Sequence, residues 1–228
     1  ELEAELEAEL EARRRQYMHY RDSLLASRDA EGVQWMPMGE LGQFVRGRRF
    51  TKADVVDEGI PAIHYGEIYT RYGVAARKTV SHVRPDLASR LRYAESGDVV
   101  IAAVGETVED VGKAVAWLGD QDVAIHDDCF LYRHSMNPKY VSYFLQTEEF
   151  HSQKTRRVAR AKVKRLSADG LAQTTIPVPP LAEQERIVAI LDKFDALVND
   201  LSIGLPAELA ARRKQYEYYR DRLLTFKE

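Results

Sequence analysis

The segment ARRRQYMHYRDSLL, residues 12–25, shows how this chain is organised, because a second copy of it lies near the other end. Residues 211–224 are ARRKQYEYYRDRLL, and ten of the fourteen positions are identical at a constant offset of 199 residues. Such a period is too long for a solenoid repeat. It indicates one helical element present twice, on either side of a globular insert.

Both copies carry a helical pattern. In the first, apolar residues from Leu2 to Leu24 fall near a 3.5-residue spacing with Glu between them. The second follows Pro179 and Pro180, which cannot lie inside a helix but commonly precede one. Its wide apolar stripe is interrupted at Gly204 and resumes at Leu209. We expect long helices over 1–30 and 179–228 that form a coiled coil; the alternative is an ordinary amphipathic surface helix at each end.

The middle of the chain, residues 31–178, has a different pattern. Short β-rich runs at 59–65, 98–104, 114–118 and 130–132 alternate with Gly, Asp and Asn turns. One helix is expected from Pro138 to about Phe150. The fold class predicted is therefore α+β, with one globular domain that has a curved or mixed sheet and is flanked by the long helices.

Composition excludes several classes of protein. With 228 residues, 45% of them hydrophobic, the chain can form a real core. The single cysteine, Cys129, excludes an internal disulfide and fits a reducing cytoplasm. Neither a membrane span nor a signal peptide is expected, because no apolar run approaches 18 residues. The opening ELEAELEAELEA lacks an initiator Met, so we expect a processed or expressed fragment of a longer protein.

Catalytic motifs are not found. The segment 178–181 has two prolines but lacks the preceding amide or acid and the following aromatic residue of an amino-methyltransferase motif. The segment 104–107 lacks the second Gly and the Lys-Ser/Thr pair of a phosphate-binding loop. The cluster 126–129, His-Asp-Asp-Cys, has no second group of ligands to complete a zinc site, so a turn or strand edge is the preferred interpretation. We expect neither catalytic residues nor a metal.

Basic residues are clustered although the net charge is only −3. Residues 154–165 hold seven basic side chains and no acidic one, and residues 46–52 hold four and none. Such density favours phosphate binding, and arginine can also bind the edge of guanine. The intervening segment 64–73 mixes aromatic, acidic and hydroxyl groups suited to base edges. The candidate DNA-binding residues are Arg46, Arg48, Arg49, Lys52, Tyr65, Tyr69, Arg71, Lys154, Arg156, Arg157, Arg160, Lys162, Lys164 and Arg165.

Two further features bear on this hypothesis. A single basic cluster is as often a solvated surface as a binding site. Residues 98–128 hold eight acidic side chains and only Lys113, so we expect that stretch to face away from phosphates, toward a protein partner.

Several motifs resemble one known family, the specificity subunits of type I restriction–modification systems. WMPMGEL at 35–41 resembles the beginning of a recognition domain in that family. IPVPPLAEQERIV at 176–188, followed by LDKFD at 191–195, is similar to the end of such a domain. The ending at 213–224 and the Glu-Leu-Glu-Ala repeats are also similar to the family's helices and spacer. The resemblance covers the whole chain in order.

The resemblance implies a fold and an organisation. Members of the family have two target-recognition domains, each reading half of a split DNA site, separated by two long helices packed antiparallel. Only one such domain is present, so the chain resembles the second half of a subunit, or a half-length one that would dimerise through its helices. We expect the end of a spacer helix at 1–30, a target-recognition domain at 31–178 and a long conserved helix at 179–228.

The resemblance also implies a function. The chain would be a non-catalytic, cytoplasmic subunit that directs methyltransferase and restriction subunits to double-stranded DNA, with no cofactor of its own. S-adenosylmethionine, ATP and magnesium would bind to the partners. The alternative is a coiled-coil scaffold that binds an acidic protein partner. The candidate partner-binding residues, on the repeated helical stripe, are Tyr17, Tyr20, Arg21, Arg213, Tyr216, Tyr219 and Arg220.

Overall fold

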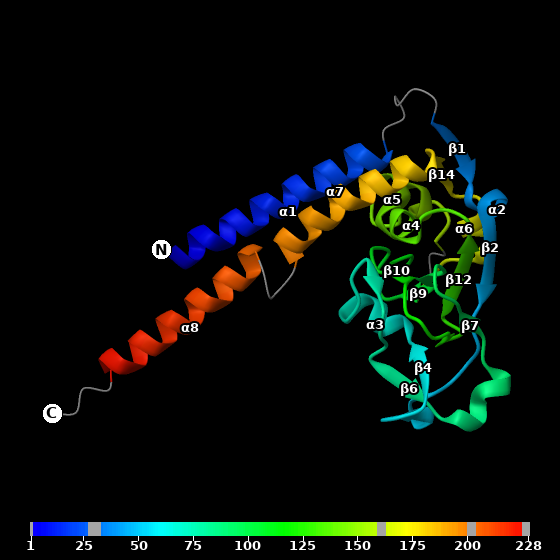
Figure 1. The fold of residues 1–228 in the computed structure, drawn as a ribbon, viewed down its shortest axis with the longest axis horizontal. Coiled ribbons are helices and arrows are strands. Elements are labelled where there is room, and N and C mark those ends of the chain that lie inside the picture. Colours follow the sequence, from blue (N-terminus) through cyan, green and yellow to red (C-terminus); the bar gives the residue numbers. More distant parts are fainter. Residues whose placement is uncertain (1, 27–32, 159–162, 200–203, 225–228) are drawn as a thin grey trace. The chain divides into compact units, whose positions relative to one another are not determined.

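The computed structural model of the chain describes residues 2–26, 33–158, 163–199 and 204–224. These form two compact units, a globular one from residues 25–185 and a helical one from residues up to 24 and from 186 onward (Figure 1). No helix among the described residues has the length and apolar character needed to cross a membrane. The two units are described separately below.

The helical unit contains α1 (Leu2–Ala26), most of α7 (Leu181–Asn199) and α8 (Gly204–Leu224). Helices α1 and α7 run antiparallel and side by side (Figure 1). Tyr17 is only 5% exposed, and its hydroxyl donates a hydrogen bond to Asp195 over 3.3 Å. Burial, together with that carboxylate, raises the pKa of Tyr17 well above its ordinary value. One turn further along α1, the ring of Tyr20 stacks on Phe194.

The expected interruption of the second helical region lies between α7 and α8. Helix α8 begins at Gly204 and has Pro206 in its first turn, where a missing backbone N–H leaves no hydrogen bond unmade. The long flanking helices of the predicted fold class are therefore confirmed.

The described part of the globular unit holds two five-stranded sheets and two two-stranded sheets. The first large sheet has the order β2 (Gly42–Arg46), β12 (Cys129–His134), β8 (Val99–Ala102), β10 (Ala114–Trp117), β5 (Ala75–Ala76). The second has the order β3 (Val55–Val56), β6 (Ser81–Val83), β4 (Ile60–Ile63), β11 (Val123–Ile125), β7 (Tyr93–Ala94). The small sheets pair β1 (Gln34–Pro37) with β14 (Thr175–Val178) and β9 (Val104–Gly105) with β13 (Lys164–Arg165).

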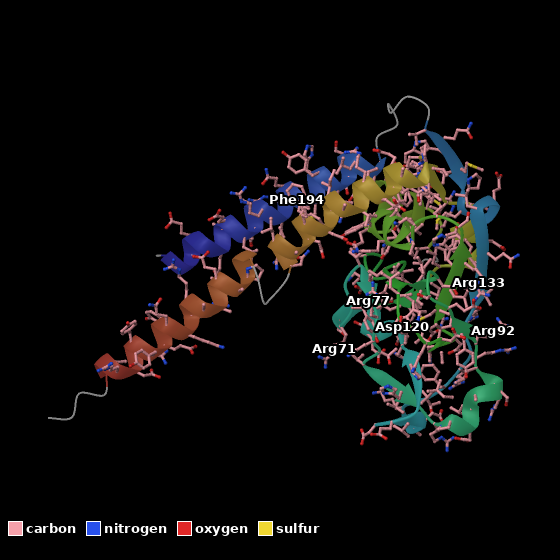
Figure 2. All side chains as sticks on the ribbon, viewed as in Figure 1. Arg71, Arg77, Arg92, Asp120, Arg133 and Phe194 are labelled. Atoms are coloured by element: carbon pink, nitrogen blue, oxygen red, sulfur yellow. The ribbon has the colours of Figure 1, made fainter. Side chains whose placement is uncertain are left out.

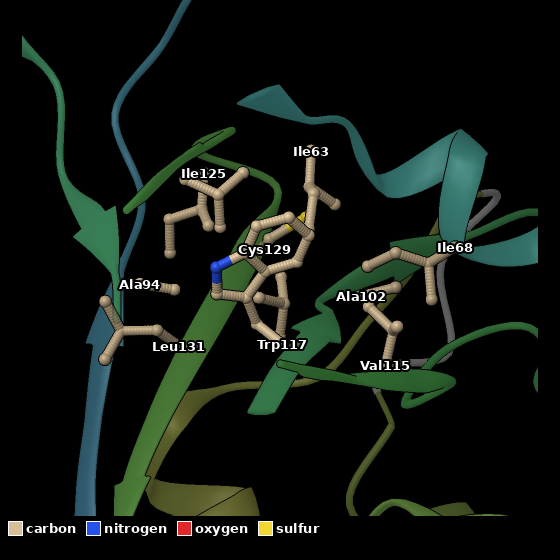
Figure 3. Close-up of a cluster of buried hydrophobic side chains, with 11 residues drawn as sticks. Ile63, Ile68, Ala94, Ala102, Val115, Trp117, Ile125, Cys129 and Leu131 are labelled. Carbon is tan, nitrogen blue, oxygen red and sulfur yellow. The ribbon is translucent and has the colours of Figure 1, made fainter. Parts of the chain in front are cut away.

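Both large sheets are mixed, as the sequence predicts. Strand β10 pairs parallel with β5, and β11 pairs parallel with β4, whereas the other pairs are antiparallel. Strand β8 is fully buried between β10 and β12, which explains why residues 99–102 are all apolar. Trp117 packs among Ile63, Ile125 and Cys129 in a core that draws on both sheets (Figure 3).

One predicted helix is wrong. In place of a single helix from Pro138 to Phe150, the chain forms α4 (Pro138–Phe144) and α5 (Glu148–Thr155). Thr147 divides them, since its hydroxyl donates to the Phe144 carbonyl over 2.7 Å and accepts from the Phe150 amide over 3.2 Å. Apolar spacing continues through this break, so the pattern alone could not reveal the cap.

The remaining helices are short. They are α2 (Met38–Leu41), α3 (Tyr65–Thr70), α6 (Ala168–Ala172) and two 3-10 turns at Lys52–Asp54 and Pro85–Arg90.

A buried glutamine closes the globular unit. Gln184, in the first turn of α7, is 2% exposed. Its side chain accepts from the Asn137 amide over 2.9 Å and donates to the Pro179 carbonyl over 2.8 Å. Nearby, β14 pairs with β1, so the first and last strands of the unit are neighbours. Gln184 therefore joins the start of α7 to the loop that precedes α4.

The substitution Gln184→Ala should lower the free energy of unfolding by roughly 2 to 4 kcal/mol, because two buried main-chain groups lose their partner. Urea unfolding followed by circular dichroism measures this change. Glu185→Ala, at the exposed neighbouring position, is the matched control and should change stability by less than about 0.5 kcal/mol. Equal effects of the two substitutions would contradict the role assigned to Gln184.

Candidate nucleic-acid interface

A groove of about 590 Å³ in the globular unit brings together segments that are far apart in the sequence. Parts of both predicted basic clusters, 46–52 and 154–165, meet there. Its lining residues are Arg46, Arg49, Phe50, Thr51, Lys52, Val55, His64, Glu67, Ser81, His126, Asp127, Asp128 and Arg165.

Main-chain hydrogen bonds hold one wall of the groove. After β2 ends at Arg46, the amide of Gly47 donates to the Cys129 carbonyl and that of Arg48 to the Ile125 carbonyl, both over 3.0 Å. A Cβ atom at Gly47 would overlap the carbonyl oxygens of Ile125 and His126, so only glycine fits. This contact seats the arginine-rich segment 46–52 directly against the turn at 125–129.

His126 fixes the same turn from inside. Its Nδ1 accepts from the Asp128 amide over 3.1 Å, so Nε2 carries the proton and donates to the Phe50 carbonyl, also over 3.1 Å. His126, Asp127 and Asp128 bring potential metal-ligand atoms within 4.8 Å of one another. Both ring nitrogens of His126 are already bonded, however, and the arrangement is explained by the turn.

A second wall comes from α3 and β6. His64 caps α3 by accepting from the Gly66 amide over 3.2 Å, and Glu67 accepts from the His64 amide over 3.0 Å. Burial lowers the pKa of His64, and the neighbouring His126 lowers it further, which favours a neutral imidazole. The hydroxyl of Ser81 donates to the Glu67 carboxylate. This wall therefore presents an imidazole, a hydroxyl and a carboxylate.

The charges in the groove are mixed. Arg49 and Lys52 are exposed and form no ion pair within the described part of the chain. Arg46 and Arg165 both approach Asp128. The turn places Asp127 and Asp128, at the end of the acidic stretch 98–128, beside these arginines, and the expectation that this stretch faces away from phosphates stays a prediction. Cations here can neutralise phosphates, and the carboxylates can accept hydrogen bonds from base amino groups.

Other candidate DNA-binding residues lie outside the groove lining. Arg48, Arg71 and Arg156 are exposed, Arg71 beside α3 (Figure 2). Arg157 is half-buried and donates to the carbonyls of Gln153 and Gln173, and Lys164 is half-buried in β13. Arg160 and Lys162 fall outside the described residues. A DNA contact remains a prediction for all seven of Arg48, Arg71, Arg156, Arg157, Arg160, Lys162 and Lys164.

For Lys154 and Tyr69, the structure contradicts the predicted role in DNA binding. Lys154 is 3% exposed, and its ammonium donates to the carbonyls of Val111 over 2.6 Å and Glu109 over 3.0 Å. It braces a loop from inside and cannot reach a phosphate. Tyr69 packs against the core, and its hydroxyl donates to the Val104 carbonyl. Tyr65 packs against the same core and is half-buried like Tyr69, and its role in binding stays a prediction.

The candidate partner-binding residues separate into two groups. Tyr17 and Arg21 are buried at 5% and 8% exposure, so direct contact with a partner protein is a wrong prediction for both. Tyr20 is 42% exposed while it stacks on Phe194. Arg213 pairs with Glu7. Arg213 is itself an exposed residue of α8, as are Tyr216, Tyr219 and Arg220.

Sequence reasoning missed several groove residues, namely Thr51, His64, Glu67, Ser81, His126, Asp127 and Asp128. His64 and Glu67 lie inside a segment suited to base reading, but nothing in the pattern distinguishes them from their neighbours. The cluster 126–128 indicates only a turn. Alternation in β6, with Val83 buried and Ser81 on the same side, is the signal that could have placed Ser81.

The domain has mixed sheets, and its arginine-lined groove also offers carboxylate and hydroxyl acceptors. These are the features of a DNA-recognition module. Flanking helices of repeated sequence are typical of a subunit in a larger assembly. The chain belongs to the type I restriction modification DNA specificity domain family, whose model matches residues 30–211.

Individual relatives agree with this assignment. The chain is 31% identical to the type I restriction enzyme EcoR124I/EcoR124II specificity subunit of Escherichia coli, over 99% of the chain and 56% of that protein. It is 30% identical to a putative type I restriction enzyme specificity subunit of Haemophilus influenzae, over 94% of the chain and 53% of the relative. The chain thus spans about half the length of these curated relatives.

A solved structure shares the fold. The HsdS subunit from Thermoanaerobacter tengcongensis aligns with a TM-score of 0.62 at 18% identity, over 91% of this chain and 50% of that one. A chain from a structure of a type I R-M system aligns with a TM-score of 0.64 at 19% identity, over 97% and 56%.

Buried Lys154 predicts a pH dependence of stability. Burial lowers its pKa to about 8, whereas an unfolded lysine titrates near about 10.4. Between these values the unfolded chain binds more protons, so the free energy of unfolding rises with pH, by up to about 1.4 kcal/mol per unit. Below about pH 8 both states hold the proton and this dependence disappears.

Urea unfolding of the wild type and Lys154→Met between about pH 7.5 and about pH 9.5 tests this prediction. The difference in unfolding free energy, wild type minus variant, should increase with pH. Lys78→Met, which removes an exposed lysine, should follow the wild-type profile. Parallel profiles for the wild type and Lys154→Met would show that the buried ammonium is not destabilised.

Proposed function

We propose that this chain is the non-catalytic DNA-recognition part of a type I restriction–modification complex and directs the other subunits to one half of a bipartite site. The observation that carries the proposal is the groove, which brings Arg165 of the second basic cluster together with Arg46, Arg49 and Lys52 of the first in a member of a DNA specificity family. The alternative of a scaffold for an acidic partner has no support among the relatives.

The groove residues would have two roles, to position the DNA through its phosphates and to read its bases. Arg49 and Lys52 are exposed and unpaired among the described residues, so they would bind phosphates and supply affinity with little sequence choice. Arginine side chains also present paired donors to the O6 and N7 atoms of guanine. The acceptors Glu67, Asp127 and Asp128 suit the amino groups of cytosine and adenine.

The triple variant Arg49→Ala, Lys52→Ala, Arg165→Ala should weaken binding to any duplex by roughly ten- to a hundredfold at about 0.1 M salt. The slope of log affinity against log salt should become shallower by about 0.9 for each phosphate that the protein no longer neutralises. Fluorescence anisotropy with a labelled duplex, measured across a salt series, gives both quantities.

A matched control removes the same charge elsewhere. Arg13, Arg15 and Arg212 are exposed arginines of the helical unit, each paired with a glutamate four positions earlier. Their triple alanine variant should bind DNA within about twofold of the wild type, because exposed pairs contribute little and lie outside the groove. An equal loss in both triple variants would show that only net charge matters.

The proposed assembly extends beyond this chain. A methyltransferase subunit would bind S-adenosylmethionine and transfer the methyl group, and a restriction subunit would use ATP and magnesium. In support, the matched relatives are named as specificity subunits of type I restriction enzymes. A cytoplasmic location, expected from the single Cys129, is part of the same proposal.

Helix α8 supplies a further interface in this proposal. Its Tyr216 is the sequence counterpart of Tyr17, yet Tyr216 is 64% exposed and Tyr17 only 5%. Tyr17 is covered by α7, so α8 should be covered by a helix of the same kind. In a second copy of this chain that face of α7 is already occupied by α1. The other half of a longer specificity subunit is therefore the preferred source of the covering helix.

A synthetic peptide of residues 181–199, which is α7 alone, should bind the full chain through α8. Tyr216→Ala should weaken that binding by about fivefold or more, because a buried tyrosine anchor is removed. Tyr218→Ala removes an equally exposed tyrosine from a different face of α8 and should change binding by less than about twofold. Anisotropy of a labelled peptide is the measurement, and indistinguishable affinities for the two variants would exclude this face.

A further inference from the structure

Asp128 bridges the two basic segments of the groove. Its Oδ1 lies 3.9 Å from Nη2 of Arg46 and 3.5 Å from Nη1 of Arg165. Arg46 is held at its other side, where Nε donates to the Asp127 carbonyl over 2.7 Å. One carboxylate oxygen thus restrains two guanidinium groups that come from distant parts of the sequence.

These restraints are weak. The side chains of Arg46 and Arg165 are 53% and 58% exposed, and both distances are long for ion pairs. Exposed pairs of this kind contribute little to stability, so a DNA phosphate can compete for either arginine. Asp128 therefore restrains Arg46 and Arg165 only weakly, and both can leave it to bind DNA.

Release of the arginines has a cost for Asp128 itself. Its side chain is only 24% exposed, and a bound polyanion would cover it further. A carboxylate that loses its partners in such a place needs a new hydrogen-bond donor. On the major-groove edges of base pairs, the donors that suit a carboxylate are the N4 amino group of cytosine and the N6 amino group of adenine.

We propose that Asp128 is a specificity-determining residue that exchanges Arg46 and Arg165 for the amino group of a DNA base. This inference rests on the proposed function of the groove. Where the sequence places cytosine or adenine against Asp128, the carboxylate accepts from the amino group and both arginines become available to the DNA. Where it does not, Asp128 retains the arginines and binding is weaker.

Asp127 provides a matched control. It is adjacent, lines the same groove, carries the same charge and is 32% exposed. Its carboxylate lies 3.3 Å from Nδ1 of His126 rather than beside a guanidinium group. Arg46 bonds only to its main-chain carbonyl, which Asp127→Asn leaves in place. Each of Asp127→Asn and Asp128→Asn removes one negative charge, so both should reduce the electrostatic repulsion of DNA equally. Only Asp128→Asn also removes the carboxylate that restrains the two arginines.

The experiment uses the full chain and a pool of duplexes with about twenty randomised base pairs. Pool affinity measures average, non-specific binding, and sequencing of the retained fraction measures base preference. Asp128→Asn should bind the pool about fivefold more tightly than Asp127→Asn, which is the order expected for release of two weak ion pairs. Asp128→Ala, which retains no side-chain acceptor, should lose the preference for cytosine or adenine at one position, whereas Asp127→Ala should keep it. Asp128→Ala should also bind the pool about as tightly as Asp128→Asn does, because both substitutions remove the carboxylate.

A second background tests the exchange directly. In a chain carrying Arg46→Gln and Arg165→Gln, the two aspartate substitutions should change pool affinity equally, because no arginine remains to be released. Equal affinities in the original background, weaker binding by Asp128→Asn, or an unchanged base preference in Asp128→Ala would each overturn the proposal. If the wild type neither binds the pool nor selects any sequence, the proposed function itself fails. If the wild type selects a sequence and the two variants agree, only the role of Asp128 fails.

Discussion

The groove depends on one close main-chain contact, the seating of Gly47 on the turn at 125–129. Any side chain at that position would overlap the carbonyl oxygens of Ile125 and His126. The two amide hydrogen bonds that follow fix the direction in which segment 46–52 leaves β2. His126 reinforces the turn from within by bonding Phe50 and Asp128. The backbone of this segment is therefore placed by main-chain contacts, and the weak ion pair of Arg46 with Asp128 adds to them.

The sequence predicts the main elements well because their signals are local. Continuous apolar runs mark the central strands, and the repeat at 12–25 and 211–224 marks the flanking helices. Motifs near Trp35 and Gln184 indicate where the domain begins and ends. The break at Thr147 could not be predicted, because a cap depends on one hydroxyl and leaves the apolar spacing unchanged.

The functional surface could be predicted only in part. Both basic clusters contribute to the groove, the second through Arg165. The charge of a residue does not show whether its side chain points outward, however, and that of Lys154 points inward and donates to main-chain carbonyls. The sequence does not indicate Asp127 and Asp128 as groove residues, because their role depends on the fold, which brings Arg165 beside Asp128.

The repeated helix shows the same limit of prediction from sequence. Arg21–Asp22 and Arg220–Asp221 form the same local ion pair, yet only the first copy is covered by another helix among the described residues.

The pairing of β1 with β14 has an evolutionary consequence. Because the first and last strands of the globular unit are neighbours, the chain leaves the domain beside the point where it arrives. Gln184 completes this junction through main-chain atoms alone, which any sequence can provide. A recombination event between the flanking helices would then exchange the whole insert, with its groove, where the chain enters and leaves the domain. Under the proposed function, such an exchange would change which DNA sequence is recognised in a single genetic step.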